Sequence, residues 1–464
     1  ELSFPSSLQY IGWSSFSGCS SLISIIVPNS IKMIGYSVFS DCRSLTQIAL
    51  PPTMKIIPDS FFANCESLET ITIPPSVQSV GSSSFKGCKS LSEIQINSSI
   101  TALGSYAFSD CSLLTKVCIP SSIEIIQSGT FKGCSALREV ILPHSLASIN
   151  ESGFEDCLSL EHITLPSKLL FVSNKCFSGC SSLKEITLPE TVCCICSQSF
   201  MNCTSLQTMV IPDSVTMIKE DAFKGCISLK SLTVDPFGVI IGPNAFGDCH
   251  LLKTLNIPPS RKATKIEKSK LKHFPLVPQF VIPSTITSIE ESAFEGMLAI
   301  EHVDIPASVT CIGRLAFRSC ASLHSLVIPS SVTCIGDSAF EGCSSLVDIS
   351  LPSSLEAIEE KAFARCSSLQ KLSIPNSVKS IGKNAFRGCT ELDSFVIPPN
   401  LVIIDDWTFS GCNNLRNVII PNSVRSIGRC AFRNCSSLIT LTIPKSVNSI
   451  GTRAFHGCIK LKEI

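Results

Sequence analysis

The sequence predicts a solenoid of about 20 stacked coils of 23 residues, with a parallel β-sheet along one face. Composition is the first observation behind this prediction, because the 464 residues include 26 Cys and 26 Phe but only three Tyr and two Trp. Spacing is the second, because Phe recurs every 23 residues in one register. The Phe residues of this register are Phe16, Phe39, Phe62, Phe85, Phe108, Phe131, Phe154, Phe177, Phe200, Phe223, Phe246, Phe294, Phe317, Phe340, Phe363, Phe386, Phe409, Phe432 and Phe455. Such a repeat indicates stacked units, since one unit cannot bury its apolar face alone.

Other residue types follow the same period. Cys lies three residues after Phe, Leu six residues after it, and Pro eleven residues before it. The exceptions are Met297 at a Cys place, Ile300 at a Leu place, and Asn97 and Asp235 at Pro places. A typical unit reads C-S-S-L-x-x-I-x-I-P-x-S-V-x-x-I-G-x-x-A-F-x-G. We refer below to the Phe, Cys, Leu and Pro places of a coil.

Each place of the unit has a physical role. Ile25 and Val27 are two residues apart, so both point to one side of a strand. Pro28 has no N–H to donate and therefore ends that strand. We expect Ile31 and Ile34 to face inward from the returning segment, while Phe fills the wide side of each coil.

A 23-residue coil with the strand pattern L-x-x-I-x-I falls within the periods of leucine-rich repeats. The Phe side is wider than the strand side, which predicts a horseshoe with its sheet on the concave face. On the convex face we expect short 3₁₀ or extended segments, because about ten residues with Gly turns hardly form a regular helix.

One unit illustrates a family resemblance. Its characteristic residues are Cys343, Leu346, Ile349, Leu351, Pro352, Leu355, Ile358, Ala362 and Phe363. This pattern resembles the BspA-like, or treponemal-type, leucine-rich repeat. Its Cys-Ser-Ser-Leu motif resembles the versions found in parasitic protists. The resemblance implies a surface or secreted protein linked to adhesion, host-matrix binding or coaggregation.

The repeat predicts one solenoid over residues 1–464, with a degenerate repeat at 258–282 that carries a two-residue insertion. If the insertion follows Pro258, Leu271 takes the Phe place and Phe280 a strand place. Neither end has a polar capping repeat, so both ends look truncated from a longer chain.

The degenerate repeat is strongly basic. Its basic residues are Arg261, Lys262, Lys265, Lys268, Lys270 and Lys272. They belong either to a solvent-exposed loop of a degenerate repeat, or to a docking patch for an acidic partner.

The Cys residues at the Cys place are predicted to be buried, reduced thiols. A parallel stack aims equivalent Cβ atoms in the same direction, which disfavours disulfides between coils. A disulfide framework is the alternative, but it is typical of short secreted domains. Cys193, Cys194 and Cys196 include a C-x-x-C, which is by itself a weak metal or redox signal.

No catalytic pattern is present. The sequence contains no phosphate-binding loop, zinc-protease motif or nucleophile elbow, so we expect no enzyme activity and no cofactor. Lys and Arg number 37, as do Asp and Glu, and this balance argues against nucleic acid as a partner. No apolar stretch is long enough to predict insertion into a membrane.

The candidate binding surface is the outward side of the strands. Two residues before the Pro place it carries Ile141, Thr164, Thr187, Val210 and Thr233, and four residues before the Pro place it carries His162 and Glu185. This composition reflects either strand propensity with packing between coils, or a surface for another protein or glycan.

Two non-enzymatic functions remain open. One is a cell-surface or secreted solenoid that binds host matrix or another surface protein. The other is a cytoplasmic scaffold that docks partner proteins through edge strands and the basic segment, which the thiol-rich composition favours.

Overall fold

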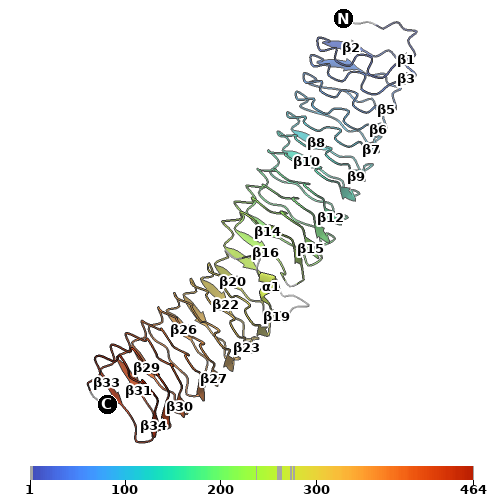
Figure 1. The fold of residues 1–464 in the computed structure, drawn as a ribbon. Helices are drawn as coiled ribbons and strands as arrows, with labels where there is room; N and C mark the ends of the chain where they lie inside the picture. Colours follow the sequence, from blue (N-terminus) through green and yellow to red (C-terminus); the bar gives the residue numbers. More distant parts are fainter. Residues whose placement is uncertain (1–3, 237, 259–263, 272–273, 275–276, 463–464) are drawn as a thin grey trace. The chain divides into compact units, whose positions relative to one another are not determined.

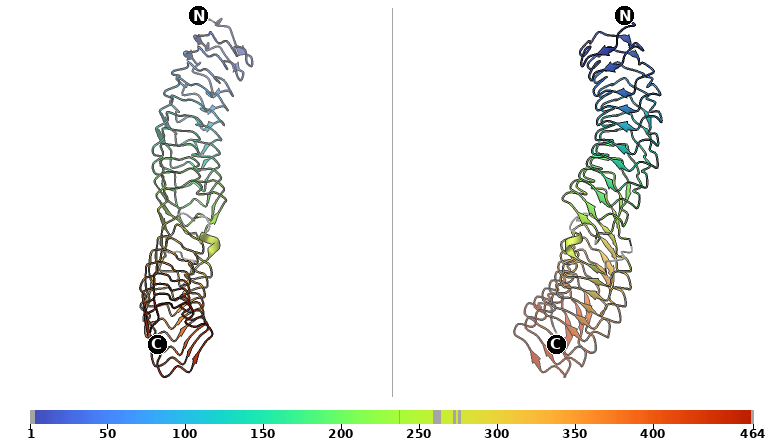
Figure 2. Two further views of the ribbon diagram at one scale, coloured as in Figure 1. Left: turned by 60° about the vertical axis from the view of Figure 1, so that its left-hand side comes forward. Right: turned by 90° about the vertical axis from the view of Figure 1, so that its right-hand side faces the viewer.

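The computed structural model describes residues 4–236, 238–258, 264–271, 274 and 277–462. The chain divides into two compact units, one of Glu1–Val234 with Val239–Leu252 and the other of Asp235–Gly238 with Lys253–Ile464. Each unit is a stack of similar coils (Figure 1; Figure 2).

Most coils contain two short strands, which we call the first and the second strand. In the first unit, the first strands are β2 (Ser24–Ile26), β4 (Gln47–Ala49), β8 (Lys116–Cys118), β10 (Glu139–Ile141), β14 (Thr208–Val210) and β16 (Ser231–Thr233). Its second strands are β1 (Tyr10–Ile11), β3 (Met33–Ile34), β5 (Ile56–Ile57), β6 (Ser79–Val80), β7 (Ala102–Leu103), β9 (Ile125–Ile126), β11 (Ser148–Ile149), β12 (Phe171–Val172), β13 (Cys194–Ile195), β15 (Met217–Ile218) and β17 (Ile240–Ile241).

The second unit repeats this arrangement. Its first strands are β18 (Thr254–Asn256), β20 (Gln279–Val281), β22 (His302–Asp304), β24 (Ser325–Val327), β26 (Asp348–Ser350), β29 (Ser394–Val396), β31 (Asn417–Ile419) and β33 (Thr440–Thr442). Its second strands are β19 (Lys265–Ile266), β21 (Ser288–Ile289), β23 (Cys311–Ile312), β25 (Cys334–Ile335), β27 (Ala357–Ile358), β28 (Ser380–Ile381), β30 (Ile403–Ile404), β32 (Ser426–Ile427) and β34 (Ser449–Ile450). A single four-residue helix, α1 (Lys268–Leu271), interrupts the described part of this unit.

The predicted parallel solenoid is confirmed. All the strand pairs are parallel, and partners usually lie 23 residues apart, as Lys116 and Glu139 do. The returning segment, expected to be 3₁₀ or extended, holds the second strands and tight turns, and the described residues contain no 3₁₀ helix. The first and second strands lie on opposite sides of the coils within each unit (Figure 1).

The core of each unit is a column of Phe rings. In the first unit, neighbouring rings from Phe16 to Phe246 stack with centroids 5.1 to 6.1 Å apart. In the second unit, the rings from Phe294 to Phe455 stack 4.9 to 5.6 Å apart. Stacked rings bury large apolar areas and add a further attraction between coils.

Two left-handed residues bracket each Phe of the register. The residue two places after Phe has positive φ and is usually Gly, Asn or Asp, the types that adopt this conformation most readily. The residue two places before Phe also has positive φ, but its type varies and includes Leu315 (φ 57°) and Trp407 (φ 60°). The coil therefore imposes the left-handed conformation two places before Phe even on residues with bulky side chains.

The described residues of the coil at 258–282 keep the strand pairing of the other coils with different side chains. Thr254 of β18 pairs with Gln279 of β20, 25 residues later, whereas Lys265 of β19 pairs with Ser288 of β21, 23 residues later. The two extra residues therefore lie before Lys265. Leu271 at the Phe place is buried, and so is Phe274 at the Cys place.

Candidate functional site

The candidate site is the outward face of the first-strand segments in the first unit. Side chains alternate along each segment, so in β10 the middle residue Val140 is 8% exposed while Ile141 is 44% exposed. Pro follows two places later and ends the strand. We define the face row as the residues two places before the Pro place in five successive coils, which are Ile141, Thr164, Thr187, Val210 and Thr233. All of these are exposed except Thr233, which is half-buried, so the structure brings the sequence-predicted residues into one register.

A second outward row lies two residues earlier in each segment. This charged row comprises Lys116, Glu139, His162 and Glu185. Lys116 Nζ lies 2.8 Å from Glu139 Oε1, and His162 Nδ1 lies 3.6 Å from Glu185 Oε1. The hydrogen bond to Glu139 and its negative charge raise the pKa of Lys116. Lys116 and Glu139 thus form an ion pair between neighbouring coils beside the face row, and His162 lies next to Glu185 in the same way.

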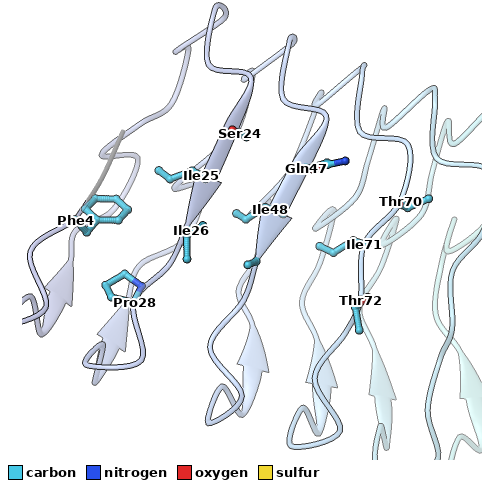
Figure 3. A pocket seen from close by; sticks show the side chains of 11 residues that line it. Phe4, Ser24, Ile25, Ile26, Pro28, Gln47, Ile48, Thr70, Ile71 and Thr72 are labelled. Atoms are coloured by element: carbon cyan, nitrogen blue, oxygen red, sulfur yellow. The ribbon is translucent and has the colours of Figure 1, made fainter. Parts of the chain in front are cut away.

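The first-strand ladder is interrupted within this region. Residues 162–164 and 185–187 keep the alternating burial of a strand but lack its pairing. A shallow hollow opens there, lined among others by His162, Thr164, Glu185 and Thr187. A larger hollow lies on the first three complete coils, where Ile25, Ile48 and Ile71 recur at the same place (Figure 3). The face is therefore uneven along the unit rather than a flat sheet.

The Cys residues at the Cys place, which we call the Cys ladder, have a structural role that the sequence did not reveal. All 26 Cys are free thiols, and those at the Cys place are buried as predicted, except Cys19, which is exposed, and Cys458, which is half-buried. Each ladder Cys except Cys19 donates its S–H to the carbonyl oxygen of the Phe 26 residues earlier, at 3.1 to 3.4 Å, as Cys134 does to Phe108. That carbonyl also accepts the N–H of Cys111 in its own coil. The thiols therefore link successive coils instead of forming a reactive centre.

The Ser residues two places after Pro act in a similar way. Ser122 donates its hydroxyl hydrogen to the carbonyl of Ile100 at 2.6 Å, and Ser214 does the same to Val192 at 2.7 Å. These bonds could not be foreseen from the sequence, because each Ser and its partner carbonyl lie 22 residues apart.

The basic segment is only partly described. Arg261, Lys262 and Lys272 lie outside the described residues, as does the side chain of Lys270. Lys265 Nζ lies 3.1 Å from Glu290 and Lys268 Nζ lies 2.7 Å from Glu295. Hydrogen bonds from Ser288 and Lys265 lower the pKa of Glu290. Acids of the following coil thus neutralise these two lysines, and a docking role for the segment stays a prediction.

The described ranges show no metal site and no membrane-spanning helix. They contain no group of three or more His, Cys, Asp or Glu side chains that could hold a metal ion. Cys194 Sγ and Cys196 Sγ lie 4.0 Å apart without a third such ligand. The described residues also include no helix of membrane-spanning length and hydropathy.

Several solved structures resemble this chain. A leucine-rich repeat protein from Bacteroides ovatus is 26% identical, with 89% of this chain and 88% of that chain covered and a TM-score of 0.46. The leucine-rich repeat protein of T. pallidum is 32% identical over 40% of this chain and 78% of its own, with a TM-score of 0.33. A leucine rich cell surface protein from Faecalibacterium prausnitzii is 27% identical over 79% and 82%, with a TM-score of 0.31.

A search of curated proteins finds no match to this chain. The profile of the family described as the BspA type leucine rich repeat region, in contrast, matches the chain from end to end. The matched segments are 1–115, 55–184, 106–230, 194–323, 264–393, 310–438 and 356–464. The chain therefore belongs to the BspA-type leucine-rich-repeat family.

Proposed function

We propose that this chain is a non-enzymatic solenoid that binds a partner protein through the face row and the charged row. We further propose that it acts at the cell surface or after secretion, in adhesion or host-matrix binding. The observation that carries the proposal is the exposure of β-branched side chains at the same place in successive coils. Ile141 is 44% exposed and Val210 is 61% exposed.

An exposed apolar row favours a protein partner for a physical reason. Side chains such as Val210 remain in contact with water although the coil already has a complete core, so a partner that covered them would remove apolar surface from water. The charged row beside them contributes orientation and selectivity more than affinity. An apolar centre with a charged border is typical of protein interfaces.

Family membership supports the same conclusion. Leucine-rich-repeat solenoids typically bind proteins and are typically non-catalytic. BspA-type proteins are often associated with the cell surface. The specific role in adhesion is the further step that the proposal takes.

The test is binding of the purified chain to a panel of immobilised matrix proteins, measured by biolayer interferometry. The double variant Ile141→Asp with Val210→Asp should lose at least about tenfold in affinity, because it places charge in an apolar contact. The matched control is Ile240→Asp, which changes a 63% exposed residue of a second strand in the same unit. Equal losses in both variants, or no loss in the double variant, would contradict the proposal.

An intracellular scaffold is the second candidate, and the 26 free thiols favour it. Reduced Cys is normal in the cytosol, whereas oxidising compartments favour disulfides. In this alternative, edge strands and the basic segment that includes Lys265 and Lys268 dock the partner. Labelling of intact cells with a membrane-impermeant reagent separates the two: labelled protein supports the surface location, and protein that is labelled only after lysis supports the scaffold.

A further inference from the structure

The residue directly after each Phe of the register lies in the turn that also contains the two left-handed residues. In the coils of Phe294, Phe317 and Phe340 these residues are Glu295, Arg318 and Glu341. Arg318 lies 3.4 Å from Glu295 and 3.3 Å from Glu341, so an acid on each side compensates its charge.

The same row changes character further along the unit. Its next members are Ala364, Arg387, Ser410, Arg433 and His456. Here each Arg has neutral neighbours in place of acids, and neither forms an ion pair with an acid among the described residues. The Nε of Arg433 is buried and has no hydrogen-bond partner there.

Trp407 lies between these two arginines. The guanidinium carbons of Arg387 and Arg433 lie 5.4 and 5.5 Å from the centroid of its ring, and that of Arg429 lies 5.9 Å away. Three coils thus meet at one half-buried indole, and the backbone N–H of Trp407 donates to the backbone carbonyl of Arg429 at 3.0 Å. A guanidinium that stacks on a ring keeps its in-plane N–H groups available for an anion.

The surrounding sequence is strongly basic. Residues 361–464 contain 14 Lys and Arg against five Asp and Glu, whereas residues 1–360 contain 23 against 32. Arg365 and Arg453 are exposed two places after and two places before Phe residues of this same region. Asp406 is the nearby acid, with Oδ2 3.9 Å from Arg429 Nε. The neutral total of the chain therefore conceals a local excess of positive charge.

We propose that Arg387, Trp407, Arg429 and Arg433 form a docking site for an acidic, extended segment of a partner protein. The proposal rests on the protein-binding function proposed above, but it assigns a separate surface. Carboxylates match the planar fork of arginine in two parallel hydrogen bonds, and Trp and Arg are the side chains that most often dominate binding energy between proteins.

The arrangement fits nucleic acid less well. Binding of single strands relies on successive aromatic side chains, on which neighbouring bases stack. The residues equivalent to Trp407 in the adjacent coils are Asn384 and Cys430, so the site offers one ring and no stacking track.

The test uses a fluorescein-labelled peptide of alternating Glu and Ala, with fluorescence anisotropy of the full chain at low salt. We expect the variant Arg387→Gln with Arg433→Gln to bind at least about tenfold more weakly. Lysine at both positions should restore only part of the affinity, because it keeps the charge and loses the fork. Arg318→Gln is the matched control and should remain within about twofold of the parent chain, because acids already occupy that guanidinium.

Three outcomes would overturn this proposal: no binding of the peptide, equal losses in Arg318→Gln and the double variant, or tighter binding of single-stranded DNA or a sulfated glycan than of the peptide at the same site. The variant Ile141→Asp with Val210→Asp should bind the peptide as the parent chain does. Failure of the docking site is thereby distinguished from failure of the face row.

Discussion

A regular coil and the degenerate coil at 258–282 solve the same packing problem with different residues. In the regular coil, Phe131 and Cys134 are both fully buried at the Phe and Cys places. In the degenerate coil, Leu271 occupies the Phe place and Phe274 the Cys place, and both are again buried. The aromatic ring has moved three residues along the chain.

The comparison teaches that a coil requires a filled volume more strictly than it requires a given residue. Cores tolerate substitutions that conserve total volume and apolar pattern. The residue type still decides which hydrogen bonds form. The thiol of Cys134 donates a hydrogen bond to the carbonyl of Phe108, whereas the side chain of Phe274 has no donor group. Regular coils therefore combine a buried Phe with a thiol link, and the degenerate coil keeps buried apolar residues at both places without a thiol at the Cys place.

The largest expected effect comes from pH, because it acts on all the buried thiols together. Burial raises the pKa of Cys42 from 9.0 to about 11, and those of Cys249, Cys343 and Cys389 to about 12. Since these values exceed that of an unfolded thiol, the stability they contribute is complete below about pH 9 and is lost as the pH rises toward 11 to 12. Denaturant midpoints should fall over this range.

Thiolate absorbance in the ultraviolet checks the cause of that fall. Native protein should keep its buried thiols, such as Cys343 and Cys389, protonated above pH 9, and unfolding should allow them to ionise. Full ionisation before unfolding would contradict the burial argument.

Removal of a ladder ring should have the next largest effect. Phe131→Ala deletes a ring that stacks 5.6 Å from Phe108 and 5.5 Å from Phe154, and should cost about 3–5 kcal/mol in the free energy of unfolding. Phe131→Leu, which copies the residue of the degenerate coil, should cost less than half of that. Denaturant titration followed by circular dichroism measures both variants; equal costs would show that volume is not the deciding quantity.

A ring added to the degenerate coil should destabilise it. Leu271→Phe places a second ring beside buried Phe274 and should cost about 1–3 kcal/mol through overpacking. Combining it with Phe274→Cys restores the regular pattern and should recover most of the lost stability. If the double variant is no more stable than the single one, the two coils do not exchange volume as inferred here.

The smallest expected effect concerns a single thiol link. Cys134→Ala removes the bond to Phe108 and leaves a small void, which should cost about 1–2 kcal/mol. Cys311→Ala changes an exposed thiol and should stay within about 0.5 kcal/mol. A similar cost for both would assign Cys134 no special role in linking coils.

Much of the fold could be predicted because the period is strict. The inward places of Ile25 and Ile34, the strand that ends at Pro28 and the reduced state of Cys134 all follow from one coil and its repetition. The pairing of the second strands was harder to predict from the sequence, since a two-residue strand such as β9 has only one exposed and one buried residue as a signal. The left-handed residue two places after Phe had a signal in Gly, Asn and Asp, whereas Trp407 and Leu315 had none.

The candidate surfaces could be predicted only in part. The face row follows from alternation along a strand, so Ile141 and Val210 were correctly expected to face outward. The cluster around Trp407 was not foreseen, because balanced totals of 37 positive and 37 negative residues hide an uneven distribution.

The sequence by itself determined the length of the coil, the order of its inward places and the parallel stacking, because every coil meets the same environment and repeats the same burial. Only the tertiary structure decided which groups meet between coils. The bonds from Cys134 to Phe108 and from Ser122 to Ile100 join residues 26 and 22 positions apart. Their pairing depends on how one coil is laid on the next. The same holds for charge: Arg318 and Arg387 occupy one repeat place, and the acids of the adjacent coils pair with Arg318 but have no counterpart beside Arg387.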